Sequence, residues 1–156
     1  SDLAMNPWSD ALWLNEHGPR GGDEINIPEK GKNYGWPMAT HGINYSGLKI
    51  PEAKGEHVEG TEKPLFVWKV SPAVSGMAFY NSDVFPQWKN KLFIGALKEK
   101  DVIVLSVKGN TVTEDGRILG DKDQRIRDVR VGPDGYLYVL TDETDGQLWK
   151  VSPSGS

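Results

Sequence analysis

The sequence contains no cysteine, so neither a disulfide framework nor a thiolate metal site can form. No apolar run approaches the roughly 20 residues that a membrane-spanning helix needs. The formal net charge of −4 provides no basic field for nucleic acid, so neither a nucleic-acid partner nor a membrane span is expected. No window keeps a sustained 3.6-residue apolar period, which argues against βαβ units.

Glycine and tryptophan are plentiful instead. The 156 residues are enough for one domain with a real core, and they include 18 glycines and six tryptophans. Clear turn signals separate short apolar segments: Gly132-Pro133-Asp134-Gly135 is one, and Lys108-Gly109-Asn110 is another. This composition predicts an all-β protein with many tight turns.

One sequence unit occurs three times: a strand, a turn, a strongly apolar strand, a polar loop and a further strand. The apolar strands are residues 11–14, 92–96 and 136–140. Such repetition is typical of a β-propeller, whose blades contain about 40–50 residues each. A sandwich is the alternative, but it would not explain the repeated order of strands and loops.

We therefore expect about three four-stranded blades in one half-propeller domain, residues 1–156. The blade units are expected at approximately residues 4–37, 65–119 and 125–153, with an insertion at 38–64. Closed propellers have roughly four to eight blades, so this chain corresponds to about half of one.

Residues 15–36 form a polar, glycine-rich stretch between short apolar strands. Two dipeptides force a tight, irregular path in which backbone carbonyls can turn toward a cation: Gly18-Pro19 and Gly21-Gly22. Asp23 and Glu24 add two carboxylates at the start of the next strand. Clustered hard oxygen donors suit calcium, although a long hairpin with a solvated tip is the simpler alternative.

Five strings in order resemble the soluble quinoprotein sugar dehydrogenases, six-bladed propellers that use pyrroloquinoline quinone (PQQ). These strings are Glu16-His17-Gly18-Pro19, Gly22-Asp23-Glu24-Ile25-Asn26, Asn33-Tyr34-Gly35-Trp36-Pro37, residues 92–98, and residues 125–129 with Gly132-Pro133-Asp134-Gly135. The resemblance covers nearly the whole chain and is strongest to the bacterial aldose sugar dehydrogenase branch. It implies the C-terminal half of a six-bladed propeller.

The resemblance also implies two calcium positions. The carbonyl oxygens of Gly18 and Pro19 would hold an ion that also binds the quinone and polarises it as a Lewis acid. Glu24, together with the carbonyl of Tyr34, matches the second, structural calcium position of the family.

Three cations are candidates for holding PQQ, a planar tricarboxylate that needs concentrated positive charge. Lys98 follows the apolar strand of the second unit, and Arg125 and Arg127 stand where the third unit begins. Two residues apart on an extended segment, the arginines would point the same way and could grip carboxylates together. Solvated surface charge is the alternative. By resemblance, three further residues would line the cofactor: Tyr45, Ala96 and Leu97.

The implied activity is oxidation of the C1 hydroxyl of an aldose to a lactone, with PQQ as hydride acceptor, in the periplasm. In the family a histidine takes the hydroxyl proton, and its motif belongs to the propeller half that precedes this segment. None of the three histidines here stands in that motif: His17, His41 and His57. No catalytic residue is therefore assigned, and this chain alone is expected to be inactive.

Two other hypotheses remain open. The chain could be an isolated or engineered half-propeller that assembles with a second copy of itself and has lost catalysis. The partner could otherwise be the missing propeller half. It could also be a sugar- or calcium-binding propeller with no redox role. An open half-propeller would expose apolar blade faces, and large aromatic side chains are the expected contributors: Trp13, Phe66, Trp68, Phe93 and Trp149.

Overall fold

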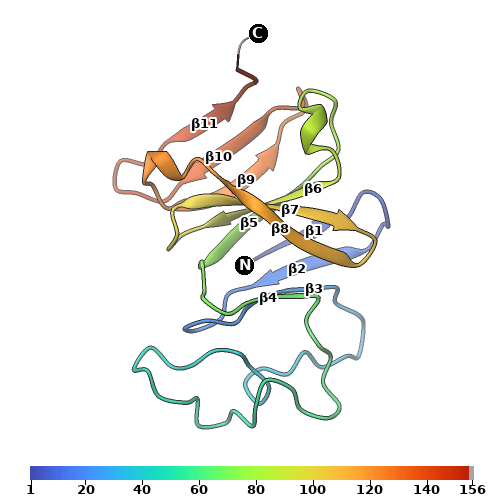
Figure 1. The fold of residues 1–156 in the computed structure, drawn as a ribbon, viewed down its shortest axis with the longest axis vertical. Coiled ribbons are helices and arrows are strands. Elements are labelled where there is room, and N and C mark those ends of the chain that lie inside the picture. The colour runs from blue at the N-terminus through green and yellow to red at the C-terminus, as the bar shows by residue number, and fades with distance from the viewer. Residues whose placement is uncertain (155–156) are drawn as a thin grey trace.

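Three antiparallel sheets in chain order make up the computed structural model, which describes residues 1–154 (Figure 1). The first sheet contains β1 (Asp2–Met5), β2 (Leu12–Glu16), β3 (Asp23–Asn26) and β4 (Phe66–Trp68). The second contains β5 (Val74–Tyr80), β6 (Lys91–Ala96), β7 (Asp101–Lys108) and β8 (Thr111–Ile118). The third contains β9 (Ile126–Val131), β10 (Leu137–Thr141) and β11 (Leu148–Val151). Two short 3₁₀ helices complete the fold: η1 (Pro86–Trp88) and η2 (Gly120–Lys122).

The prediction of an all-β propeller with about three blades is confirmed, because each sheet begins with the same three-stranded meander. The membership of β4 differs from expectation. Its Phe66 pairs with Ile25 of β3, so β4 closes the first sheet instead of opening the second. The boundary between these units therefore follows Trp68. The insertion leaves the first sheet after β3 and returns as β4, which pairs with β3. The order of strands in the sequence does not reveal this return.

The middle sheet is buried on both faces, and this explains its apolar runs. Along β6, Leu92 and Ile94 pack toward the first sheet while Phe93 packs toward the third. Successive side chains of a strand point to opposite faces, so one apolar run supplies both interfaces. The outer strands β1 and β11 instead alternate between half-buried and exposed residues.

Most of the aromatic residues expected at open faces are in fact covered. Trp13 and Phe93 are fully buried and Trp68 nearly so, whereas Phe66 and Trp149 are half-buried. These side chains point toward the neighbouring sheet of the same chain. Exposed apolar side chains lie on the end sheets instead: Leu3, Met5 and Leu12 on the first, and Leu140 and Leu148 on the third.

The start of β5 joins the first sheet to the second. The ladder between β5 and β6 shifts register between Val74 and Met77, which leaves backbone groups of β5 free to bond elsewhere. Three side chains of the first sheet bond this stretch: Asp23 accepts from the N–H of Val74, Asn15 donates to the carbonyl of Ser75, and Asp2 accepts from the N–H of Met77. Strands β5 and β9 also approach closely, since a Cβ on Gly76 would lie 2.6 Å from the Cα of Asp128.

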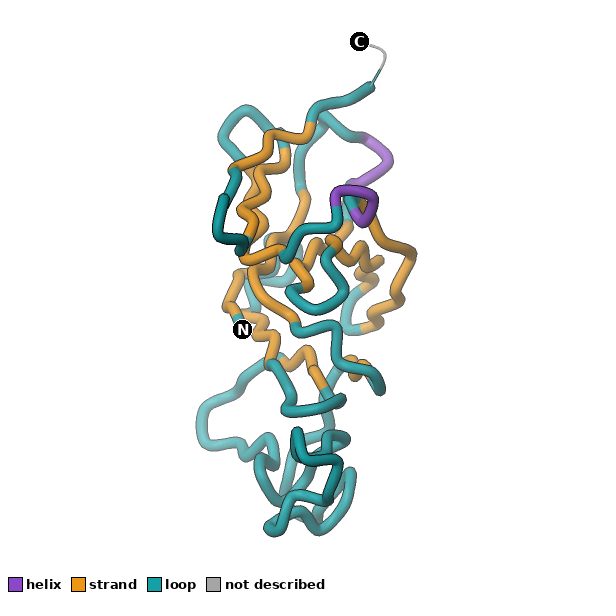
Figure 2. The backbone as a smooth tube through the Cα atoms, turned by 90° about the vertical axis from the view of Figure 1, so that its left-hand side faces the viewer, coloured by secondary structure: helices purple, strands orange, loops and turns teal. Residues whose placement is uncertain are grey.

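The insertion gathers at one end of the molecule. Figure 2 shows this irregular chain beyond the sheets. An isolated bridge between Arg20 and Ile43 attaches it to the glycine loop, and a second, between Ala39 and Gly55, lies within it. Among residues 1–154, the structure has no helix with the length and apolarity to cross a membrane.

Candidate functional site

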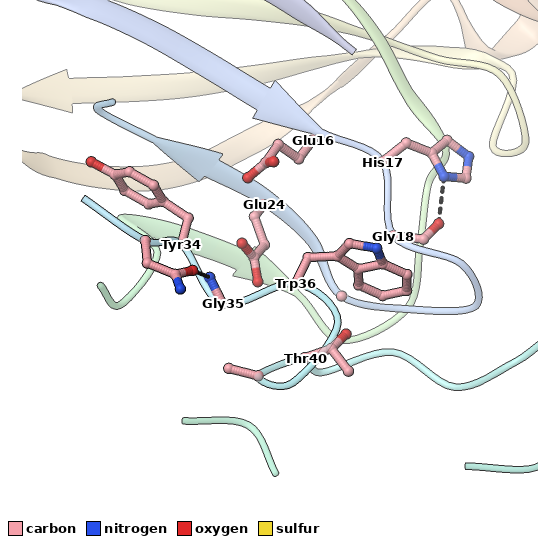
Figure 3. Close-up of a pocket in the computed structure, with 11 residues that line it drawn as sticks. Glu16, His17, Gly18, Glu24, Tyr34, Gly35, Trp36 and Thr40 are labelled. Carbon is pink, nitrogen blue, oxygen red and sulfur yellow. Dashed lines mark hydrogen bonds between the residues drawn. The ribbon is translucent and has the colours of Figure 1, made fainter. Parts of the chain in front are cut away.

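A cavity of about 220 Å³, here called the carboxylate cavity, lies between the glycine loop after β2 and the segment before the insertion. It brings together three residues predicted to bind calcium: Gly18, Glu24 and Tyr34. Glu16 lines it as well, directly opposite Glu24 on the paired strands β2 and β3 (Figure 3). The cavity therefore collects carboxylate and backbone oxygen atoms from several segments.

The two carboxylates share one amide. Asn26 Nδ2 donates to Glu16 Oε2 at 2.6 Å and to Glu24 Oε2 at 3.2 Å. Burial, and secondarily the charge of Glu16, raise the pKa of Glu24. Asn26 itself is buried, and its Oδ1 has no hydrogen-bond partner within residues 1–154. Like charges directly opposite each other are unfavourable, so a cation would stabilise this donor set.

Calcium fits the cavity only with help from the backbone. Residues 1–154 contain no cluster of three or more acidic or histidine side chains that could hold a metal by themselves. The Tyr34 hydroxyl is already engaged, since it donates to the Ile27 carbonyl at 2.7 Å and accepts from the N–H of Glu29 at 2.9 Å. Any contribution of Tyr34 to an ion would therefore come from its carbonyl.

Asp23 holds the glycine loop in place through a hydrogen bond. Its Oδ1 accepts a hydrogen bond from the N–H of Gly18 at 2.9 Å, and its side chain is fully buried. The loop is so tight that a Cβ on Gly18 would lie 2.8 Å from the carbonyl carbon of Gly22. The Gly18 carbonyl oxygen contacts His17 Nδ1, which donates to it (Figure 3).

A second cavity, the basic cavity, has a volume of about 330 Å³ and borders the same glycine loop, since His17 lines both cavities. Its lining includes three residues predicted from the sequence, Pro19, Tyr45 and Lys98, together with Arg20. In the described part of the chain, neither Arg20 nor Lys98 forms an ion pair. Uncompensated positive charge beside a phenol suits a planar, carboxylate-bearing ligand.

Arg125 and Arg127 lie together but apart from this lining. Both guanidinium groups bond Asp142 Oδ2, at 3.2 Å from Arg125 Nη2 and 3.0 Å from Arg127 Nη2. These two guanidinium groups hold the pKa of Asp142 below its usual range. Arg127 lines a different cavity from Lys98, one that it shares with Gly76 and Leu140. The structure thus places the three predicted cations at two positions.

The remaining two predicted residues lie in the interior. Ala96 is fully buried in the core between the first two sheets, and Leu97 is 8% exposed. The N–H of Leu97 donates to the Ala73 carbonyl at 2.9 Å, and the N–H of Lys98 donates to the Pro72 carbonyl at 3.1 Å. These bonds fix the turn that directs Lys98 to the basic cavity.

A family comparison decides where this arrangement belongs: the model of glucose/sorbosone dehydrogenases matches residues 1–150. The chain belongs to the glucose/sorbosone dehydrogenase family. Within this family, aldose sugar dehydrogenase YliI of Escherichia coli K12 is 82% identical over 151 residues, which are 97% of this chain and 41% of that protein.

Two further comparisons also match nearly the whole of this chain to less than half of the other protein. The quinoprotein glucose dehydrogenase B of Acinetobacter calcoaceticus is 26% identical, across 95% of this chain and 42% of its own length. The apo-form crystal structure of the soluble aldose sugar dehydrogenase from Escherichia coli superposes with a TM-score of 0.95 at 81% identity, over 97% of this chain and 44% of that one. The chain thus spans less than half the length of these family members.

The sequence did not single out four residues that the structure places in the two cavities or beside the arginine pair: Glu16, Arg20, Asn26 and Asp142. Glu16, Arg20 and Asn26 lie in or beside the motifs that were recognised, and the pairing of β2 with β3 would have placed Glu16 opposite Glu24. For Asp142 the sequence carries no comparable signal, because its partners are 15 and 17 residues away.

Proposed function

We propose that this chain is the cofactor-binding half of a quinoprotein aldose sugar dehydrogenase, which oxidises the C1 hydroxyl of an aldose to a lactone with PQQ as hydride acceptor. One observation carries the proposal: Pro19, Tyr45 and Lys98, which come from three separate segments, line the same basic cavity. Relatives described as an aldose sugar dehydrogenase and a quinoprotein glucose dehydrogenase support it.

In this proposal the cations of the chain bind the carboxylates of the cofactor. Lys98 acts from the basic cavity, while Arg125 and Arg127 act as a pair. When bound, PQQ supplies the quinone that accepts hydride from the sugar. Ala96 and Leu97 contribute through backbone atoms, since their side chains are buried. The histidine that takes the hydroxyl proton is placed outside this chain, and the periplasm is proposed from the resemblance.

Calcium is proposed at both predicted positions. The carbonyls of Gly18 and Pro19 would hold one ion at the border of the two cavities, where it could polarise a bound quinone. Glu24 and the carbonyl of Tyr34 would hold the other, and the geometry adds Glu16 to this set. Opposed carboxylates are the observation that supports the second ion.

The proposal is tested by titrating PQQ, with calcium present, into the wild-type chain and Arg127→Ala. We expect Arg127→Ala to weaken PQQ binding about tenfold or more, because charge-assisted hydrogen bonds contribute roughly 1.5–3 kcal/mol. Quenching of tryptophan fluorescence gives the dissociation constant. The matched control is Arg117→Ala, which removes an arginine paired with Asp101 on the second sheet. Equal affinities for wild type and both variants would contradict the proposed cofactor grip.

A second candidate role is assembly into a closed ring. Exposed apolar side chains at both ends support it: Leu3 and Met5 on β1, and Leu148 on β11. Packing the first blade of one copy on the third blade of another would cover them and give six blades.

For this assembly we expect a dimer mass by light scattering at micromolar concentration, and a monomer mass for Met5→Glu. Leu48→Glu is the control, since Leu48 is also an exposed apolar residue but lies on the insertion. A monomer mass for the wild-type chain, together with a cooperative thermal transition, would rule the closed dimer out.

A further inference from the structure

Asp142 occupies a position fixed by the backbone ladder of the third sheet. Thr141 of β10 pairs with Ile126 of β9, and the next N–H, that of Asp142, donates to the Arg125 carbonyl at 2.7 Å. Asp142 therefore stands across from Arg125. The ladder shifts register at this point, so Arg127 of β9 has no partner on β10, yet its guanidinium group also reaches Asp142. The pairing of Asp142 with Arg125 and the bulge at Arg127 together bring one carboxylate to two guanidinium groups.

The contacts converge on a single atom. Asp142 Oδ2 accepts from Arg125 Nε at 3.4 Å and Nη2 at 3.2 Å, and from Arg127 Nη2 at 3.0 Å. Within residues 1–154, Arg125 Nη1 and the Nε and Nη1 atoms of Arg127 make no hydrogen bond. Each guanidinium group is thereby held at one corner and keeps free donors for a ligand.

Stability does not account for this arrangement. The side chains of Arg125, Arg127 and Asp142 are 42%, 50% and 37% exposed, and ion pairs at such exposure contribute little to folding. Two adjacent guanidinium groups also repel each other unless a negative charge lies between them. A carboxylate that bonds both groups at once lowers this repulsion and limits their rotamers.

We infer that Asp142 is a positioning residue, which holds Arg125 and Arg127 as one two-armed receptor for a carboxylate group. The inference rests on the proposed function, because the carboxylate to be received is one of those of PQQ. Asp142 acts through the arginines and needs no contact with the cofactor. Simple electrostatics predicts the opposite effect for its removal, since losing a negative charge should favour an anionic ligand.

The test compares PQQ binding by the whole chain in wild type, Asp142→Asn and Asp142→Glu. We expect Asp142→Asn to weaken PQQ binding about tenfold, the effect of losing one charge-assisted hydrogen bond. This loss is expected although the variant protein carries a more positive net charge than wild type. Asp142→Glu should recover much of the affinity. The matched control is Asp134→Asn, which removes a carboxylate of the same region that bonds Tyr138 and Lys150. Unchanged or tighter binding by Asp142→Asn would overturn the inference.

A measurement without ligand separates this inference from the proposed function. In ¹⁵N NMR spectra, the Nε–H signals of Arg125 and Arg127 should show slow guanidinium rotation in wild type and faster rotation in Asp142→Asn. If wild type and Arg127→Ala bind PQQ equally, the cofactor grip fails, and these signals alone decide whether Asp142 orders the pair. Identical signals in wild type and Asp142→Asn would refute the positioning role.

Discussion

Replacing Asp23 with alanine is expected to destabilise the chain by about 2–6 kcal/mol, because it leaves two backbone N–H groups without an acceptor at roughly 1–3 kcal/mol each. The Asp23 carboxylate is fully buried and accepts from the N–H of Gly18 at 2.9 Å and of Val74 at 3.0 Å. One side chain thus holds both the glycine loop and the junction with the second sheet. Urea unfolding followed by tryptophan fluorescence measures the loss.

Asp23→Asn distinguishes hydrogen bonding from volume. The asparagine amide keeps the shape of the carboxylate but can accept only through one oxygen. We therefore expect Asp23→Asn to show much of the destabilisation of Asp23→Ala. Asp121→Ala is the control, since Asp121 is exposed and, within residues 1–154, pairs only with Lys122 at 3.8 Å; it should change stability by less than about 0.5 kcal/mol. If Asp23→Ala unfolded at the same urea concentration as Asp121→Ala, the assigned role of Asp23 would be wrong.

Removing calcium is expected to have the second large effect. At a calcium concentration of 100 times the dissociation constant, binding to the folded state alone contributes about 2.7 kcal/mol. A chelator should therefore lower the melting temperature by roughly 5–10 °C for a chain of this size. Glu24→Gln should show a smaller chelator effect than wild type, because one of the opposed carboxylates has been neutralised while the position at Gly18 and Pro19 is retained.

The chelator effect should also depend on pH in a defined direction. Burial and the charge of Glu16 raise the pKa of Glu24, so a proton competes with calcium there at a higher pH than at an ordinary carboxyl group. The effect should accordingly shrink as the pH falls toward that raised pKa. Glu62→Gln is the control, because Glu62 pairs with Lys32 at the surface. A wild-type melting curve unaffected by chelator at neutral pH would contradict the site.

Much of the fold could be predicted because it is encoded locally. The turn at Gly132-Pro133-Asp134-Gly135 and the apolar strand that follows it are short-range signals, and a turn followed by an apolar strand recurs in each blade. The sheet to which Phe66–Trp68 returns was not predictable in this way, since 39 residues separate β4 from its partner β3. The exposure of Trp13 was misjudged for a related reason, because its partner Phe79 belongs to the next blade.

The residues of the candidate site could likewise be predicted only where they lie close together in the sequence. Gly18, Glu24 and Tyr34 lie within one motif-rich stretch, and the structure brings them to one cavity. Lys98 and the arginine pair were expected from their places in the repeat, but the repeat does not specify distances between blades. Asp142 lies 17 and 15 residues from Arg125 and Arg127 in the sequence, so only the three-dimensional structure reveals their contact.

The register shift at the start of β5 has a consequence for how the chain folds. The partners of this stretch lie 51, 60 and 75 residues away, and all three belong to the first sheet. Neither sheet can complete its hydrogen bonding alone, so the two should form and open as one cooperative unit, not as independent repeats. Amide protons of Val74 and Met77 would then exchange with solvent only when the first two blades separate.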